Sequence, residues 1–424
     1  MRRFRAQLDC TNSLVFLGVI LFLFSDFFRI SFFQRMNLDS LPYLKNINII
    51  GLIIILTLII QRKGILLINK KTFLIFVFVT CGFLSFINGG SQIYLMPLYI
   101  CNLLVPLLLL NCKFKVKDGL LLFRYFLIFY NVWVVLLIIL GLSDYILDGK
   151  INGWLTQNFY SDSMAKLANS QYSTTYRLSS PWGPSLFNGF LILVFLILNS
   201  VYYSIFQKKN VKLYLVYIIT FIGVILVGSK ACFSLCFLYI VITKISGKNK
   251  LFNLAIIMLL FFVMFNSEFF QDNIWGRVIG QYETGTLSSG RNDILSFVTS
   301  GHISFPNIFI GNGAGFSRLL STKLQGLYNT TNNFEYPAIM FSYDYGIFPT
   351  ILYYLLIFGL PLYRLIRSYK ILAISLITLF VYLNTFNGLA DVFYDFNYKY
   401  IFLIIIFNSI VNASKDKEEI TKRA

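Results

Sequence analysis

The chain has 424 residues, of which 57% are hydrophobic and 18% aromatic, and its mean hydropathy of +0.71 excludes a soluble globular domain. Its formal net charge of +18 would suit a nucleic-acid-binding protein. We exclude that class because the basic residues are scattered among many short loops and form no domain-sized patch. No nucleic-acid partner is expected.

Apolar segments follow one another along the whole chain, and several approach the length of about 20 residues that crosses a hydrocarbon core as a helix. They predict an all-α integral membrane protein with about twelve transmembrane helices, in contact with membrane lipids. The turn before residue 231 is a candidate re-entrant turn or half-helix. The predicted spans are 13–33, 46–61, 72–88, 93–112, 119–142, 186–206, 213–228, 231–245, 251–265, 337–361, 371–387 and 399–413.

Lysine and arginine are distributed unevenly between the two sides that these spans define. With the N-terminus inside, the inner segments carry 24 of these residues and the outer segments carry 12, spread over longer loops. An excess of positive charge marks cytoplasmic loops. The sequence therefore predicts that both termini are cytoplasmic. The first apolar run lacks a small-residue cleavage site, so we expect it to be a retained span.

Two long polar and aromatic stretches, 143–185 and 266–336, are then predicted to be loops on the outer, periplasmic side. Within the second, Asn292–Thr299 favours a helix, and a region rich in proline and glycine follows. Pro337 favours the start of the next helix, because its missing N–H would have no partner there. The aromatic content favours order over disorder. We expect one polytopic domain, residues 1–424, with a folded cap over a cavity between the spans.

The cysteines and the histidine indicate no metal site. All six cysteines lie in or beside predicted spans, neither long loop contains one, and His302 is the single histidine. A disulfide framework and a zinc site of cysteine or histidine ligands are therefore not expected. We predict neither a metal nor a cofactor.

The most specific constellation of motifs lies in the second loop and the span after it. It consists of Ser289-Gly290-Arg291, Gly311-Asn312-Gly313-Ala314-Gly315-Phe316, and Glu335 followed by Asp344-Tyr345-Gly346. It resembles the O-antigen polymerase and ligase superfamily of bacterial envelope glycosyltransferases, in which a Ser-Gly-Arg segment precedes a Gly-x-Gly-x-Gly turn. Gly228-Ser229-Lys230 resembles the family's Ser-Arg-Gly hairpin, and the stretch 177–183 resembles the Arg- and Gly-containing stretch before its middle span.

The resemblance implies a GT-C-like fold in the bacterial inner membrane and a metal-independent glycosyltransferase. Such a polymerase moves a growing glycan from undecaprenyl pyrophosphate onto an incoming lipid-linked repeat unit at the periplasmic face. A chain-length regulator protein is a further expected partner. Glu335 stands at the position of the ligase histidine, which favours polymerase over ligase. The family's Arg-x10-Gly spacing is not kept, because eleven residues separate Arg177 from Gly189 and nine separate Arg291 from Gly301.

Three cations near predicted outer span ends suit the stabilisation of a departing pyrophosphate: Arg177, Lys230 and Arg291. Without a metal, the developing negative charge needs fixed cations, and the planar arginine side chain bonds two phosphate oxygens at once. The alternative for each cation is that it snorkels to the interface or pairs with a carboxylate. Gly313 and Gly315 are expected to offer backbone N–H groups to the same anion, the alternative being a simple tight turn.

Glu335 is the first candidate for the general base, because it lies at the predicted water–membrane boundary, where partial desolvation favours proton uptake by a carboxylate. It would act together with Arg291 as the catalytic pair. Its alternative role is an interfacial anchor. Asp293 and His302 are secondary candidates for the base. Asp344, deeper in the same span, is a candidate for a buried interhelical hydrogen bond or, secondarily, for catalysis.

Two other functions stay open. One is the ligase reaction, which transfers the glycan to lipid A–core. The other is a twelve-span flippase of lipid-linked repeat units. A transporter is expected to carry its key charges at mid-membrane between short loops, whereas this chain has long loops on one side and few charges within its spans. The sequence therefore favours the polymerase.

Overall fold

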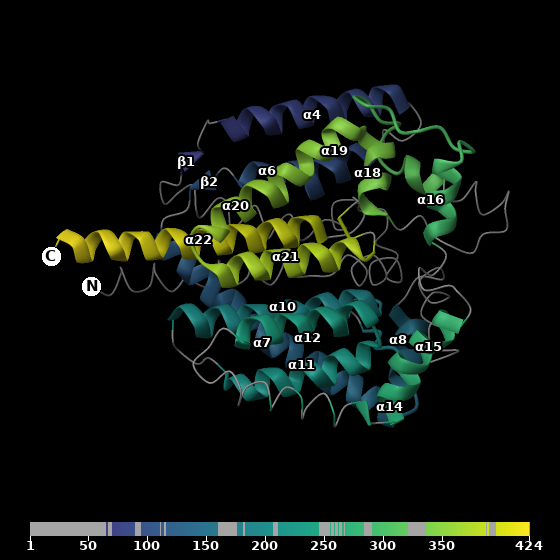
Figure 1. Cartoon of the computed structure of the whole chain (residues 1–424), viewed down its shortest axis with the longest axis vertical. Coiled ribbons are helices and arrows are strands. Elements are labelled where there is room, and N and C mark those ends of the chain that lie inside the picture. The colour runs from purple at the N-terminus through teal and green to yellow at the C-terminus, as the bar shows by residue number, and fades with distance from the viewer. Residues whose placement is uncertain are drawn as a thin grey trace. The chain divides into compact units, whose positions relative to one another are not determined.

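The structure is a computed structural model of the chain and is mostly helical (Figure 1). It describes residues 65–66, 70–89, 95–110, 112–113, 116–159, 176–180, 183–206, 211–245, 255, 258, 262, 265–266, 268–283, 291–320, 336–386, 388–389 and 396–423. The predicted spans 13–33 and 46–61 lie outside this part of the chain, and 251–265 lies almost wholly outside it.

The chain divides into two compact units. Unit 1 contains the described residues of Phe123–Tyr282 and Ile377–Tyr382. Unit 2 contains those of Leu56–Leu122, Glu283–Leu376 and Leu383–Ala424. Two helices, α7 (Val116–Ile146) and α21 (Lys370–Asn384), contribute several residues to each unit, and α15 (Gly276–Glu283) belongs to unit 1 except for its last residue.

Unit 1 is built around α10 (Ser185–Phe206), which packs against α11 (Leu213–Val227) and α12 (Lys230–Ile245). The side chains of Asn131 on α7 and Asn199 on α10 exchange two hydrogen bonds, of 2.7 and 3.1 Å, inside this apolar packing. Such amide pairs hold helices together where no water competes. Gly223 lets α11 approach closely, because a Cβ there would come within 2.6 Å of Ile138 and Ile192.

Short helices from the two long loops lie at one end of this unit, where Figure 1 labels α8, α14 and α15. They are α8 (Lys150–Phe159), α14 (Glu268–Phe270), the π-helix η4 (Gln271–Trp275) and α15 (Gly276–Glu283). The ring of Phe270 lies 5.2 Å from that of Phe233 in the first turn of α12. Both loops therefore contribute to the end of unit 1 at which α12 begins.

Unit 2 contains α4 (Lys70–Gly89), α5 (Met96–Tyr99), η3 (Ile100–Leu104), α6 (Val105–Leu109), α16 (Arg291–Thr299), α18 (Pro337–Tyr345), α19 (Ile347–Tyr354), η5 (Leu355–Gly359), α20 (Leu360–Ile366) and α22 (Phe396–Arg423). Two short strands, β1 (Ile65–Leu66) and β2 (Cys112–Lys113), pair antiparallel. Aromatic rings in stacked and tilted contacts lie in its core, among them Phe78, Tyr99, Phe341, Tyr345 and Tyr353.

Four described helical segments are long and apolar enough to cross a membrane: Lys71–Asn88, Phe123–Ile146, Ser185–Phe206 and Ile347–Ile366. Shorter apolar helices are Leu213–Val227, Lys230–Thr243, Lys370–Asn384 and Phe396–Asn412. An α-helical membrane protein is thereby supported, whereas the number of twelve spans and a GT-C-like fold stay predictions. The predicted span 337–361 is broken at Gly346, so that the candidate span begins at Ile347.

Candidate functional site

Lys230 opens α12 directly after a tight turn from α11. Gly228 ends α11 in the left-handed conformation, with φ +61°, and its N–H donates to the carbonyls of Val224 and Ile225. This conformation is easy for glycine and strained for other residues. The hydroxyl of Ser229 accepts the N–H of Cys232 at 3.3 Å, which caps the N-terminus of α12. The Gly-Ser-Lys sequence thus closes one helix and starts the next.

The segment that carries Arg177 lies against this turn. The N–H of Leu178 donates to the carbonyl of Leu226 at 2.8 Å. A Cβ placed on Gly228 would lie 3.5 Å from the carbonyl oxygen of Tyr176 and 3.7 Å from Cγ of Arg177. Arg177 is half-buried, and so is Lys230, two residues after the glycine. Tertiary structure therefore brings Arg177 beside the α11–α12 turn, although about fifty residues separate Arg177 from this turn in the sequence.

A buried carboxylate anchors the start of this segment. The hydroxyl of Tyr176 lies 2.9 Å from the carbonyl of Gly141 and 3.2 Å from Oδ2 of Asp144, so both oxygens are placed to accept its hydrogen bond. The other carboxylate oxygen of Asp144 accepts the N–H of Asn152 at 2.8 Å. Asp144 is 1% exposed. It therefore fixes the end of α7, the start of α8 and the Arg177 segment together.

Asn188, in the first turn of α10, forms hydrogen bonds with the C-terminal end of the segment that carries Arg177. Its amide nitrogen donates to the carbonyls of Leu178 and Gly183 at 2.8 and 3.1 Å, and its amide oxygen accepts the hydroxyl of Ser180 at 2.8 Å. Ser180 and Gly183 also exchange two backbone hydrogen bonds. Asn188 is fully buried. Sequence reasoning missed this residue, because an asparagine at the start of an apolar span looks like any interfacial polar residue.

Tyr382 of α21 contacts the starts of α10 and α12 within unit 1. Its hydroxyl donates to the carbonyl of Leu186 at 2.7 Å and also bonds the hydroxyl of Ser229. A side chain at Gly189 would overlap the Tyr382 hydroxyl. Gly189 therefore makes room for a tyrosine that braces the start of α10 and the cap of α12. No signal in the sequence distinguishes Tyr382 from the chain's other tyrosines.

In unit 2, the glycine-rich turn after residue 310 wraps around the C-terminal end of α18. The N–H of Asn312 donates to the carbonyl of Tyr343, and that of Gly313 to the carbonyl of Asp344, both at 2.9 Å. The hydroxyl of Ser85 on α4 donates to the same Asp344 carbonyl and accepts the N–H of Gly313 at 2.8 Å. These bonds join α4, the turn and the end of α18.

The carboxylate of Asp344 binds the second half of this turn. It accepts the N–H of Ser317 at 2.7 Å and that of Gly315 at 3.2 Å, and Asp344 is 4% exposed. The anion that the turn holds here is thus a side chain of the protein itself. The amides of Gly313 and Gly315, predicted to contact pyrophosphate, already have acceptors within the chain. Gly311 lies so close to Asp344 that a Cβ would overlap its backbone carbonyl.

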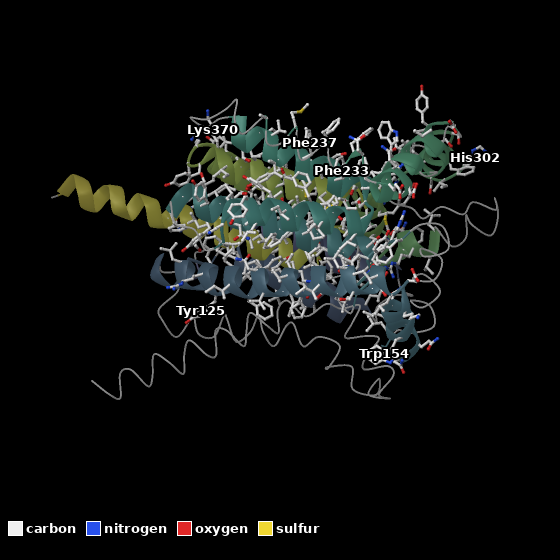
Figure 2. The ribbon with its side chains drawn as sticks, turned by 90° about the horizontal axis from the view of Figure 1, so that it is seen from below. Tyr125, Trp154, Phe233, Phe237, His302 and Lys370 are labelled. Carbon is white, nitrogen blue, oxygen red and sulfur yellow. The ribbon has the colours of Figure 1, made fainter. Side chains whose placement is uncertain are left out.

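The remaining predicted residues are placed as follows. Arg291 begins α16, which confirms the predicted helix at Asn292–Thr299, while the side chains of Arg291 and Asp293 lie outside the described part of the structure. Glu335 also lies outside it. His302 is exposed (Figure 2), and its Nδ1 lies 2.7 Å from the hydroxyl of Ser300.

The structure therefore brings together Arg177 and the turn that carries Lys230, both in unit 1, whereas Arg291 and Asp344 belong to unit 2. Among the described residues, no group of three or more histidine, cysteine, aspartate or glutamate side chains could hold a metal ion. No protein-family model, no curated protein and no solved structure matches this chain.

Proposed function

We propose that this protein is a polysaccharide polymerase of the O-antigen type. It transfers a growing glycan from undecaprenyl pyrophosphate onto a lipid-linked repeat unit at the periplasmic face of the bacterial inner membrane. The observation that carries the proposal is the position of Arg177 against Gly228 in the α11–α12 turn. Lys230 follows this glycine by two residues and begins α12. Two cations from distant parts of the chain are thereby held at one end of a bundle of apolar helices.

The local arrangement suits a phosphate group for three reasons. Arg177 supplies a planar group that bonds two oxygens at once. Lys230 adds a second positive charge in the first turn of α12, where the helix dipole also favours an anion. Both side chains are half-buried, so that their charges are less screened than on an open surface. A pyrophosphate at this end of the helices leaves its polyprenyl chain free to stay in the bilayer.

In the proposed reaction, a hydroxyl of the acceptor sugar attacks the anomeric carbon of the donor. The bond from this carbon to the pyrophosphate oxygen breaks, and the proton of the hydroxyl passes to a general base. Glu335 is the first candidate for this base, and Asp293 and His302 are the others. Arg177 and Lys230, with Arg291, stabilise the negative charge on the departing pyrophosphate. The reaction needs no cofactor.

The test is glycan transfer by the purified protein in liposomes with lipid-linked repeat units. Removing one fixed cation that acts in the transition state costs roughly 100-fold in rate, so Arg177→Ala and Lys230→Ala are expected to lose activity by about that factor. Arg177→Lys is expected to recover part of it. Arg124→Ala and Lys212→Ala are the matched controls, because both residues lie in unit 1, outside the Arg177 segment and the α11–α12 turn.

Full activity of Arg177→Ala and Lys230→Ala would refute this site. Arg291→Ala tests the third cation in the same assay. Two further outcomes would favour a different function. Product formed only when lipid A–core is the acceptor would identify a ligase. In a deletion strain, persistence of lipid A–core capped with single repeat units is expected for a missing polymerase, whereas loss of these capped forms as well would identify a flippase.

A further inference from the structure

A segment of the second long loop forms backbone hydrogen bonds on both sides of the helix break at Gly346. Gly346 has φ +102° and separates α18 from α19. The N–H groups of Ile347 and Phe348, at the start of α19, donate to the carbonyls of Asn307 and Ile308 at 3.0 and 2.8 Å. On the other side of the break, Asn312 and Gly313 bond the last carbonyls of α18, as described above. The loop thus supplies the partners that a continuous helix would have had.

Several backbone groups of this loop segment also have partners within the protein. The side-chain oxygen of Asn307 accepts the N–H groups of Phe309 and Ile310 at 3.0 and 3.3 Å. The carbonyl of Gly311 accepts the side-chain amide of Asn88 on α4 at 3.3 Å. Irregular backbone is tolerated at membrane depth where its polar groups are paired within the protein. Within 307–313, the carbonyls of three residues and the N–H groups of four are paired in this way: Asn307, Ile308 and Gly311 as acceptors, and Phe309, Ile310, Asn312 and Gly313 as donors.

The side chains that the segment exposes are large and apolar. Phe305 is 69% exposed, Ile308 58% and Phe309 62%. No aspartate, glutamate, lysine or arginine occurs between His302 and Arg318. We call Phe305, Ile308 and Phe309 the apolar ledge. Side chains of this kind are unfavourable in water, and a contiguous exposed apolar patch marks an interaction surface.

The apolar ledge continues the outward face of a candidate membrane span. The ring of Phe309 lies 6.0 Å from that of Phe348 in the first turn of α19. From there, exposed apolar side chains follow at helical spacing along Ile347–Ile366, at Ile351 (60%), Leu355 (40%) and Tyr363 (58%). A helix long and apolar enough to span a bilayer presents such a face to lipid.

We propose that the apolar ledge is immersed in the lipid acyl chains of the leaflet at the N-terminal end of α19. Residues 305–309 are then a membrane-embedded anchor, although they belong to a stretch predicted as a periplasmic loop. The anchor holds the glycine-rich turn and Asp344 at a fixed depth. The proposal depends on the membrane span Ile347–Ile366 and does not depend on the proposed glycan transfer.

The test places a nitroxide spin label on single introduced cysteines in the full chain, reconstituted in liposomes. Phe305→Cys and Phe309→Cys are compared with Ile351→Cys, in the span, and with Ser300→Cys, an exposed position on the same loop. Wild-type protein carried through the same labelling gives the contribution of the six native cysteines. Collisions with oxygen, which concentrates in lipid, and with a water-soluble nickel chelate are measured at each label.

We expect labels at 305 and 309 to behave like that at 351, with frequent collisions with oxygen and loss of those with the nickel chelate. The label at 300 should show the reverse. Nickel collisions at 305 and 309 equal to those at 300 would overturn the proposal, because the ledge would then face water. Protection of both labels from both reagents would also overturn it, because protein, such as a second copy of the chain, would then cover the ledge.

Discussion

Replacement of Asp344 by asparagine tests whether this residue is a structural acceptor for the glycine-rich turn. The carboxylate accepts two backbone N–H groups, from Gly315 and Ser317, in a site that is 4% exposed. Asparagine has one side-chain oxygen, so one of the two N–H groups must face an NH₂ group instead. A hydrogen bond to a charged group contributes about 1.5–3 kcal/mol, and a buried N–H without an acceptor costs about 1–3 kcal/mol.

We therefore expect Asp344→Asn to destabilise unit 2 by about 2–4 kcal/mol. For a unit of this size the apparent melting temperature should fall by roughly 5–10 °C. The assay is the fraction of detergent-solubilised protein that stays monodisperse in size-exclusion chromatography after heating. Because such heating is irreversible, variants are compared at one heating rate.

The matched control is Asp148→Asn. Asp148 is exposed, and its φ of +52° suits asparagine as well as aspartate. The same chemical change is therefore expected to leave the melting temperature unchanged there. Equal melting temperatures for Asp344→Asn and Asp148→Asn would refute the structural reasoning. Loss of glycan transfer by Asp344→Asn without loss of stability would instead assign Asp344 to catalysis.

Two glycine substitutions and one tyrosine substitution test the packing around the two sites, and two further glycine substitutions serve as controls. Gly311→Ala forces a Cβ into a backbone carbonyl and should cost about 3 kcal/mol, measured as lost folded protein, whereas Gly153→Ala meets no atom within 4 Å and should be tolerated. Gly228→Ala and Gly301→Ala both strain a left-handed residue, by about 1–2 kcal/mol. Glycan transfer should fall in the Gly228→Ala variant and stay unchanged in the Gly301→Ala variant. Equal rates of transfer by the two variants would contradict the proposed site. Tyr382→Phe removes both hydrogen bonds of the Tyr382 hydroxyl, with Leu186 and Ser229, and should lower stability by about 1–3 kcal/mol. An unchanged melting temperature would contradict its bracing role.

The sequence by itself determined the helical membrane class and much of the order of helices. Runs of apolar residues have few alternatives to a helix in lipid, so α4, α7, α10, α11 and α12 begin and end within a few residues of the predicted spans. The start of α18 at Pro337 and the helix before residue 300 were also predictable, because local backbone chemistry sets them. The predicted membrane orientation and enzymatic activity stay predictions.

Tertiary structure alone decided which distant groups meet. Spacing in the sequence marked Arg177 and Lys230 separately, but their common location depends on hydrogen bonds from Asn188, Tyr176 and Leu178, whose partners lie up to about fifty residues away. The glycine-rich turn shows the same limit. Its pattern predicted amide groups arranged around an anion, and a pattern of glycines cannot specify which anion. Only packing against α18 shows that the carboxylate of Asp344 takes that position, because a buried charge must find its partners within reach in the folded chain.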